Sequence, residues 1–123
     1  MKRLVFDLDD TLTINQAGLP YPEQRPNLPI IEKLREYQGM GFEIIIFTAR
    51  NMRSYNGSVG KINAVTLPII VEWLSKHNVP YDESHIGKPW CGHDGFYVDD
   101  KAIRPSEFAS LTYEEIRELI DKK

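Results

Sequence analysis

The sequence contains one cysteine and no long uncharged apolar segment. Cys91 has no second cysteine to pair with, so an intrachain disulfide and a cysteine-based zinc cage are both excluded. The longest uncharged apolar runs, such as residues 44–47 and 67–71, are too short to cross a bilayer. The first residues begin a charged strand and not the apolar region of a signal peptide. We therefore expect a cytoplasmic protein with no membrane partner.

An excess of positive charge is also lacking. Lysine and arginine together number 15 against 18 aspartates and glutamates, which gives a formal net charge of −3. This balance provides no general attraction to polyanions, so nucleic acid is not the expected partner, although a local basic patch stays open. A chain of 123 residues has room for one hydrophobic core, and we predict a single domain over residues 1–123.

What the sequence does contain is an alternation of strand and helix patterns. The run at residues 42–47 is nearly all apolar, which is typical of a strand covered on both faces. The order of elements predicts an α/β fold, a single-domain Rossmann-like open parallel sheet flanked by helices. We expect strands at residues 3–8, 42–47, 83–86 and 96–98 (the last one short and buried). The first helix is expected to be capped by Asn27 and stopped by Gly39 and Gly41, and two further helices are expected at residues 66–78 and 112–121.

Local signals refine these boundaries. Residues 14–27 contain three prolines and one glycine, which indicates a loop or a small flap. Pro68 disfavours a helix interior, so the second helix is expected to begin near Thr66 or to kink there. Thr112 and Glu115 have the spacing of a capping box, which predicts the start of the last helix.

Polar and charged side chains follow each expected strand. In open parallel sheets the ligand site lies beyond the carboxyl ends of the strands. Four strands that deliver such groups to the same edge therefore predict one shared site. The groups are Asp7, Asp9 and Thr11 after the first strand, Thr48 and Arg50 after the second, Lys88 after the third, and Asp99 and Asp100 after the fourth.

The residue types of this site fit phosphoryl transfer. Aspartate can act as a nucleophile that forms an aspartyl-phosphate, and Mg²⁺ prefers carboxylate oxygens and water as ligands. Lys88 can bind phosphoryl oxygens, and Thr48 can donate to one of them, because charge in the transition state spreads over three oxygens. Asp9, two residues beyond Asp7, can protonate the leaving oxygen and then activate water.

Four short motifs carry a family resemblance that covers essentially the whole chain. "DLDDTLT" contains Asp-x-Asp-x-Thr directly after an apolar strand, and "FTAR", "GKPW" and "YVDDKAIRP" follow in that order. This set resembles the four signatures of the haloacid dehalogenase (HAD)-like superfamily. An aspartate occupies the second conserved position of the first motif, so the resemblance implies a phosphate ester hydrolase and not a dehalogenase.

The resemblance also implies a role for each matching residue. Asp7 would be the nucleophile and a Mg²⁺ ligand, and Asp9 would be the acid/base and a ligand through its backbone carbonyl. Asp99 would be the second carboxylate ligand, and Asp100 would be a ligand or would orient a metal-bound water. The predicted catalytic residues are therefore Asp7, Asp9, Thr48 and Lys88.

Relatives that act on small metabolites usually carry an inserted cap domain. Only residues 14–27 and 51–63 could be insertions in this chain, and neither is long enough for a domain, so the resemblance implies a capless member. Capless relatives tend to act on macromolecules or to close the site with a neighbouring subunit, which leaves a homodimer open. Whole-chain similarity is nearest to small HAD-type proteins of capsule or other surface polysaccharide biosynthesis. It implies a phosphorylated sugar or polysaccharide precursor as the substrate.

Three other interpretations stay open. The first is a phosphatase for a macromolecular phosphate, on a polynucleotide or a protein. The second is a non-enzymatic phospho-acceptor similar to a response-regulator receiver, although the acidic pair stands here after the lysine and not before it. The third is a binding or scaffold protein whose site has decayed, although no motif residue is missing.

Further substrate contacts are expected from the loops beside the motifs. Tyr21 and Arg25 are candidates because the flap would adjoin the site, and residues 51–61 are as well explained by a mobile polar loop. Trp90, Cys91 and His93 follow Lys88 and are candidates to shape the mouth of the site, but Cys91 and His93 are two ligands, too few for a metal site. The predicted substrate-binding residues are Thr11, Ala49, Arg50, Asn51 and Arg53.

Overall fold

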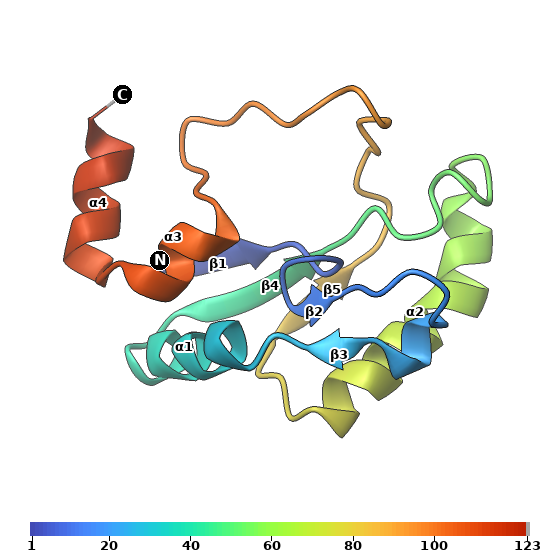
Figure 1. Cartoon of the computed structure of the whole chain (residues 1–123), viewed down its shortest axis with the longest axis horizontal. Coiled ribbons are helices and arrows are strands. Elements are labelled where there is room, and N and C mark those ends of the chain that lie inside the picture. The colour runs from blue at the N-terminus through green and yellow to red at the C-terminus, as the bar shows by residue number, and fades with distance from the viewer. Residues whose placement is uncertain (123) are drawn as a thin grey trace. The chain divides into compact units, whose positions relative to one another are not determined.

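A three-stranded parallel sheet lies at the centre of residues 1–90 (Figure 1). The register pairs Val5 with Ile45 and Ile45 with Glu83, so the carboxyl ends of all strands meet at one edge. The computed structural model describes residues 1–122, and within them it confirms a parallel α/β sheet flanked by helices, with no cap domain. The strands, in order across the sheet, are β1 (Arg3–Phe6), β4 (Glu43–Phe47) and β5 (Glu83–His85).

Two helices connect consecutive strands of this sheet, and each helix buries one of its own faces in the core. Helix α1 (Leu28–Gly39) buries the four apolar residues that recur at helical spacing along it, Ile30, Ile31, Leu34 and Tyr37. Helix α2 (Val59–Lys76) buries Ile62, Thr66, Ile70, Trp73 and Leu74. Together with the three buried isoleucines of β4 these side chains form the core, and full burial of one such aliphatic residue contributes roughly 1.5–3 kcal/mol.

Helix α2 begins at Val59, so the prediction of a start near Thr66 was wrong. The side chain of Ser58 accepts a hydrogen bond from the backbone N–H of Lys61 (3.3 Å) and caps the first turn. Pro68 lies inside the helix, where it cannot donate a backbone hydrogen bond. The prediction gave too much weight to this proline and overlooked the cap that lies ten residues before it.

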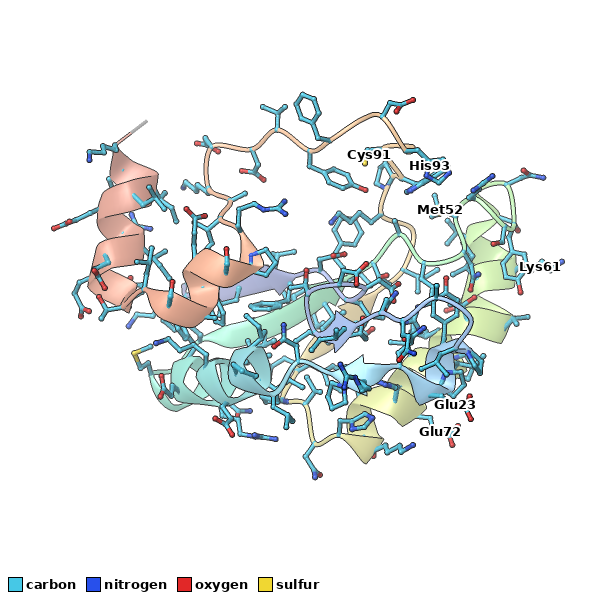
Figure 2. The ribbon with its side chains drawn as sticks, viewed as in Figure 1. Glu23, Met52, Lys61, Glu72, Cys91 and His93 are labelled. Atoms are coloured by element: carbon cyan, nitrogen blue, oxygen red, sulfur yellow. The ribbon has the colours of Figure 1, made fainter. Side chains whose placement is uncertain are left out.

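Residues 14–27 form a small flap, as predicted. Its base is an antiparallel pair, β2 (Thr13–Ile14) with β3 (Arg25–Pro26), and the short 3₁₀ helix η1 (Tyr21–Glu23) lies between them. Helix α2 contacts η1. In Figure 2, Glu23 of η1 and Glu72 of α2 accordingly lie close to each other. The flap is therefore built against a helix of the core.

Gln24 fastens the flap from inside. Its buried side chain donates to the carbonyl oxygens of Leu19 (2.9 Å) and Gln16 (3.1 Å) and accepts from the backbone N–H of Gln16 (2.7 Å). The indole N–H of Trp73, on α2, donates to the carbonyl oxygen of Gln24 (2.8 Å). These contacts replace the ladder that two strands of two residues each are too short to provide.

A second unit begins at Cys91 and contains α3 (Pro105–Ser110) and α4 (Tyr113–Asp121). The predicted capping box is confirmed: the hydroxyl of Thr112 accepts from the N–H of Glu115 (3.1 Å), and the carboxylate of Glu115 accepts from the N–H of Thr112 (2.9 Å). The sequence pattern did not predict α3. Because the chain divides into two units, the single domain over residues 1–123 stays a prediction.

No strand forms at residues 96–98, so the prediction of a short buried strand there was wrong. Phe96 is 79% exposed and Val98 is 88% exposed. A run of three apolar residues matches the pattern of a strand, but it forms one only when a neighbouring strand accepts its hydrogen bonds. The sheet of residues 1–122 therefore has three strands where four were expected.

The helices of residues 1–122 include none whose length and apolar character would suit a membrane span.

Candidate active site

The turn that follows β1 gathers its backbone around one carbonyl group. The oxygen of Leu8 accepts hydrogen bonds from the N–H groups of Thr11 (3.3 Å), Leu12 (2.9 Å) and Thr13 (3.1 Å). Asp10 has a φ of 60°, a left-handed conformation that aspartate tolerates better than most residues. This tight turn places Asp7 and Asp9 at the carboxyl end of the strand, as the spacing of the motif predicted.

Asp7 is held from both sides of its carboxylate. The hydroxyl of Thr11 donates to Oδ2 (3.2 Å), and the ammonium group of Lys88 lies 3.7 Å from Oδ1. The side chain of Asp7 remains 39% exposed, so a ligand can approach it. The fold therefore brings a partly exposed carboxylate and a lysine together from residues that are 81 positions apart (88 − 7).

Asp9 lies in a different environment, because its carboxylate is clamped. The guanidinium group of Arg50 donates twice, from Nε to Oδ2 (3.1 Å) and from Nη2 to Oδ1 (2.8 Å). The side-chain amide of Asn15 donates to Oδ1 as well (3.1 Å). A bidentate pair of this kind fixes the plane of the carboxylate. The orientation of Asp9 is therefore set by a residue of the second motif and a residue of the flap.

Thr48 and Lys88 reach the site through backbone pairing at the ends of β4 and β5. The N–H of Thr48 donates to the carbonyl oxygen of His85 (3.0 Å), and the N–H of Lys88 donates to the carbonyl oxygen of Thr48 (3.1 Å). Gly87 has a φ of +88°, which lets the chain turn just before Lys88. The buried hydroxyl of Thr48 accepts from the N–H of Arg50 (3.1 Å).

Burial and charge act against each other at this edge. Desolvation raises the pKa of Asp7 above its ordinary value, and the nearby Lys88 and the hydrogen bond from Thr11 offset only part of that rise. Burial also raises the pKa of the Tyr21 phenol, and the charge of Asp9 adds to the rise, while Arg50 opposes it. Tyr21 is therefore neutral at physiological pH, since its ordinary pKa is already 10.0.

The structure places the predicted substrate-binding residues in different settings. Thr11 and Arg50 are engaged with Asp7 and Asp9, and the side-chain oxygen of Asn51 accepts from the hydroxyl of Thr66 on α2 (2.7 Å). Ala49 accepts a hydrogen bond from Met52 through its carbonyl oxygen (3.0 Å). Direct substrate contacts by these residues stay predictions.

Arg53 is exposed, and its guanidinium carbon lies 5.6 Å from the centre of the Trp90 ring. The pair brings together the loop after β4 and the residue two positions beyond Lys88. Trp90 was a candidate for the mouth of the site, and its contact with Arg53 was not predicted because the two residues lie in separate segments of the chain.

Asp99 and Asp100 belong to the second unit, and both are exposed. The carboxylate of Asp99 accepts from the N–H of Lys101 (2.8 Å). Among residues 1–122 no three His, Cys, Asp or Glu side chains are grouped closely enough to hold a metal ion. The metal set of Asp7, Asp9, Asp99 and Asp100 therefore stays a prediction.

Cys91 and His93 lie near each other on the irregular stretch that opens the second unit (Figure 2). Cys91 is an exposed free thiol, and its sulfur lies 3.6 Å from the carbonyl oxygen of Gly92. Neither residue belongs to a metal cluster among the described residues.

Sequence reasoning missed Asn15 and left the part of Tyr21 undefined. Asn15 belongs to a turn network: its N–H donates to the carboxylate of Asp10 (3.1 Å), and its side-chain oxygen accepts from the hydroxyl of Thr13. The Tyr21 ring lies against the guanidinium group of Arg50, with 3.9 Å from the Arg50 Cζ atom to the ring centre. No local pattern marks the contact of Tyr21 with Arg50, since the two residues lie in different segments of the chain. The partners of Asn15 all lie within six positions of it, so the turn-forming Asp and Asn residues of this segment are the signal that could have found it.

The chain closely resembles a protein of known structure. A crystal structure of an MCSG target from Vibrio cholerae is 63% identical, covers 99% of this chain and is itself covered to 98%, with a TM-score of 0.95. The chain belongs to the same family as this Vibrio cholerae protein. No protein-family model matches the chain, and no curated protein sequence matches it.

Two more distant likenesses concern the fold alone. A chain of the Pnkp1/Rnl/Hen1 complex matches 69% of this chain over 27% of its own length, with 22% identity and a TM-score of 0.54. A chain of the Pnkp1/Rnl/Hen1 RNA repair complex matches 99% of this chain over 32% of its own length, with 17% identity and a TM-score of 0.52. Together with the parallel sheet, these likenesses agree with the predicted α/β fold.

Proposed function

We propose that the protein is a Mg²⁺-dependent phosphohydrolase that acts through an aspartyl-phosphate on Asp7. The observation that carries the proposal is the setting of Asp7: a partly exposed carboxylate at the carboxyl edge of parallel strands, with Lys88 at 3.7 Å from one oxygen and Thr11 at 3.2 Å from the other. This is the arrangement of a carboxylate nucleophile beside a cation that can bind the phosphoryl group.

The reaction would proceed in two displacements. Asp9, which Arg50 holds as a carboxylate, first takes up a proton from solvent. An oxygen of Asp7 then attacks phosphorus, the bond from phosphorus to the leaving oxygen breaks, and Asp9 gives its proton to that oxygen. Water then attacks phosphorus and passes a proton to Asp9, and the bond to Asp7 breaks to release phosphate. Because the Thr48 hydroxyl accepts from Arg50, its own proton remains available to a phosphoryl oxygen.

The oxygen donors that Asp7 and Asp9 offer at this edge fit Mg²⁺. Asp7 offers a carboxylate whose charge is penalised by burial, and a divalent cation would offset that penalty. Asp7 and the backbone carbonyl of Asp9 would supply oxygen ligands, which is the chemistry that Mg²⁺ prefers. The motif resemblance adds Asp99 and Asp100 of the second unit as further ligands. When bound, the ion would neutralise negative charge on the transferring phosphoryl group.

The substrate we propose is a phosphorylated sugar or polysaccharide precursor. The exposed pair of Arg53 and Trp90 supports this choice, since an aromatic face can stack on a ring and a guanidinium group can bind further oxygens. Trp90 stands two positions after Lys88, so the pair would adjoin the phosphoryl group.

A macromolecular phosphate is the second candidate. It is favoured by the lack of a cap domain among residues 1–122, which leaves no domain of this part of the chain to enclose a small substrate. The fold likeness to a part of an RNA repair complex adds the end of a polynucleotide to the substrates worth testing. This alternative predicts a higher kcat/KM on oligomers than on free sugar phosphates.

Phosphate release from a substrate panel tests the proposal. The panel contains sugar phosphates, nucleotides and oligonucleotides phosphorylated at the 3′ or 5′ end, each with Mg²⁺ and with EDTA. We expect Mg²⁺-dependent turnover that falls by about 10³-fold or more in Asp7→Asn. Asp10→Asn is the matched control, because asparagine also tolerates the positive φ of that turn position.

The outcomes separate the candidates. Full activity in the Asp7→Asn variant would rule out Asp7 as the nucleophile. A single phosphorylation per protein molecule, without turnover, would indicate the receiver-like phospho-acceptor. The substrate with the highest kcat/KM would decide between a sugar phosphate and a macromolecular end.

A further inference from the structure

Arg50 is a buried cation whose position is fully determined by the protein. Its side chain is 1% exposed, and two of its three nitrogens bind the carboxylate of Asp9. The third, Nη1, is buried and has no hydrogen-bond partner among the described residues. A buried guanidinium group of this kind is costly unless it is paired, so the clamp on Asp9 is what retains it. Arg50 is therefore better described as a support for Asp9 than as a group that waits for substrate.

Tyr21 covers the guanidinium group from the flap. The Arg50 Cζ atom lies 3.9 Å from the centre of the Tyr21 ring, which is the distance of direct stacking. The neutral ring supplies a negative face to the cation and restricts the directions in which the guanidinium group can move. Arg50 is consequently confined by Asp9 on its edge and by Tyr21 on its face.

The position of Tyr21 is itself fixed from the core. Tyr21 begins the 3₁₀ helix η1, and the N–H of Gln24 donates back to the Tyr21 carbonyl oxygen (3.2 Å). Gln24 in turn accepts the indole N–H of Trp73 on α2. A continuous series of contacts therefore runs from α2 through Gln24, Tyr21 and Arg50 to Asp9.

We propose that Tyr21 and Arg50 are positioning residues that orient the Asp9 carboxyl group toward the leaving oxygen of the substrate. The inference rests on the proposed function and deepens it, since it assigns the flap a part in the proton transfer that the motifs alone do not. Arg50 acts by fixing the plane of the carboxyl group with two bonds. Tyr21 acts by keeping Arg50 in the one position from which both bonds form.

The dependence on the leaving group tests this inference. An alkoxide leaving group needs the proton of Asp9, whereas 4-nitrophenolate leaves without one. We expect Arg50→Lys, which can make only one of the two bonds, to lower kcat about 100-fold on an alkyl phosphate. The expected loss on 4-nitrophenyl phosphate is below about tenfold, with KM changed less than about threefold on both substrates.

Tyr21 variants repeat the test from the flap. We expect Tyr21→Leu, which keeps apolar bulk but lacks the aromatic face, to lose about tenfold in kcat on the alkyl phosphate alone. Tyr21→Phe should remain within about twofold of the wild type, because the ring is kept. Phe42→Leu is the matched control, since the Lys2 ammonium group lies 5.5 Å from the centre of the Phe42 ring, and Phe42 precedes β4 at the end opposite Thr48. Equal losses on both substrates would overturn the inference, because a general distortion of the site does not distinguish leaving groups.

A second measurement does not need activity. We expect Tyr21→Leu to lower the urea midpoint of unfolding in the wild type at least twice as much as in an Asp9→Asn background, where the clamp is already weakened. Equal shifts in the two backgrounds would show that Tyr21 and Asp9 are not coupled. If the wild type releases no phosphate from any substrate, the proposed function fails, and this cycle still decides whether the series of contacts exists.

Discussion

The turn after β1 and the stretch from Cys91 to Arg104 differ in how their polar groups are satisfied. In the turn, residues 7–15, carboxylates and hydroxyls find partners within a few positions or on Arg50 and Lys88. In the other stretch the backbone is irregular, and Phe96 and Val98 expose most of their surface. Both carry two of the predicted metal ligands. The polar side chains of a motif are therefore satisfied within the protein where their partners are near in sequence or follow strands of the same sheet.

The largest expected effect concerns the clamp on Asp9. Asp9→Asn leaves the Arg50 cation, which is 1% exposed, without its counter-charge. We expect a loss of roughly 3 kcal/mol in the free energy of unfolding, measured by urea denaturation. Asp99→Asn is the matched change in the exposed stretch, and it should alter stability by less than about 0.5 kcal/mol. Similar losses of unfolding free energy in Asp9→Asn and Asp99→Asn would contradict the difference between the two regions.

A magnesium titration tests whether Asp7 of the turn and Asp99 of the exposed stretch are both ligands of the same Mg²⁺ ion. At a Mg²⁺ concentration about tenfold above its Kd, binding to the folded state alone stabilises it by about 1.4 kcal/mol. We expect this increase, measured as a rise in Tm, in the wild type and in Asp10→Asn. It should be absent in Asp7→Asn and in Asp99→Asn. A rise that survives in Asp99→Asn would remove that residue from the metal set.

The pH dependence of the metal-free protein sharpens the account of Asp7. Burial raises the pKa of this carboxyl group in the folded state, so the folded chain binds more protons than the unfolded chain just above pH 3.8, the ordinary value. The contribution of Asp7 to stability therefore decreases as the pH rises through that window. We expect Asp7→Asn to have a slightly higher Tm than the wild type at pH 7 in EDTA, and the difference should shrink toward pH 4. A lower Tm for the variant at pH 7 would contradict the sign.

The smallest expected effect concerns residues 96–98, where a buried strand was predicted and the structure shows an exposed, irregular segment. Phe96→Ser and Val98→Ser remove apolar side chains that are mostly exposed in the structure. Each should change the free energy of unfolding by less than about 0.5 kcal/mol in the metal-free protein. Ile45→Ser in β4 is the buried reference and should cost at least 2 kcal/mol, roughly, since a core aliphatic side chain is lost and a hydroxyl is buried. A large loss from Val98→Ser would reinstate the predicted buried strand.

Local chemistry explains which predictions succeeded. The apolar run of β4, the helical spacing of Ile30, Ile31 and Leu34 and the capping box at Thr112 are patterns that a segment carries by itself. The approach of Lys88 to Asp7 was also predicted, because parallel strands bring their carboxyl ends to one edge. The late start expected for α2 shows the opposite case, where one proline outweighed the cap at Ser58.

Sequence patterns were sufficient to predict the strands β1, β4 and β5, the helices α1, α2 and α4, the order of these six elements, and the polar residues that follow the three strands. Hydrophobic periodicity, caps and turns act over a few positions, and that is enough to establish them. The tertiary structure was needed to show that Arg50 binds Asp9 through two hydrogen bonds and that Tyr21 covers Arg50. Those contacts join residues from three separate segments, and side chains so far apart in the chain meet only after the sheet and the flap have formed. The same reason explains residues 96–98: a strand is a property of two partners, and its sequence describes only one of them.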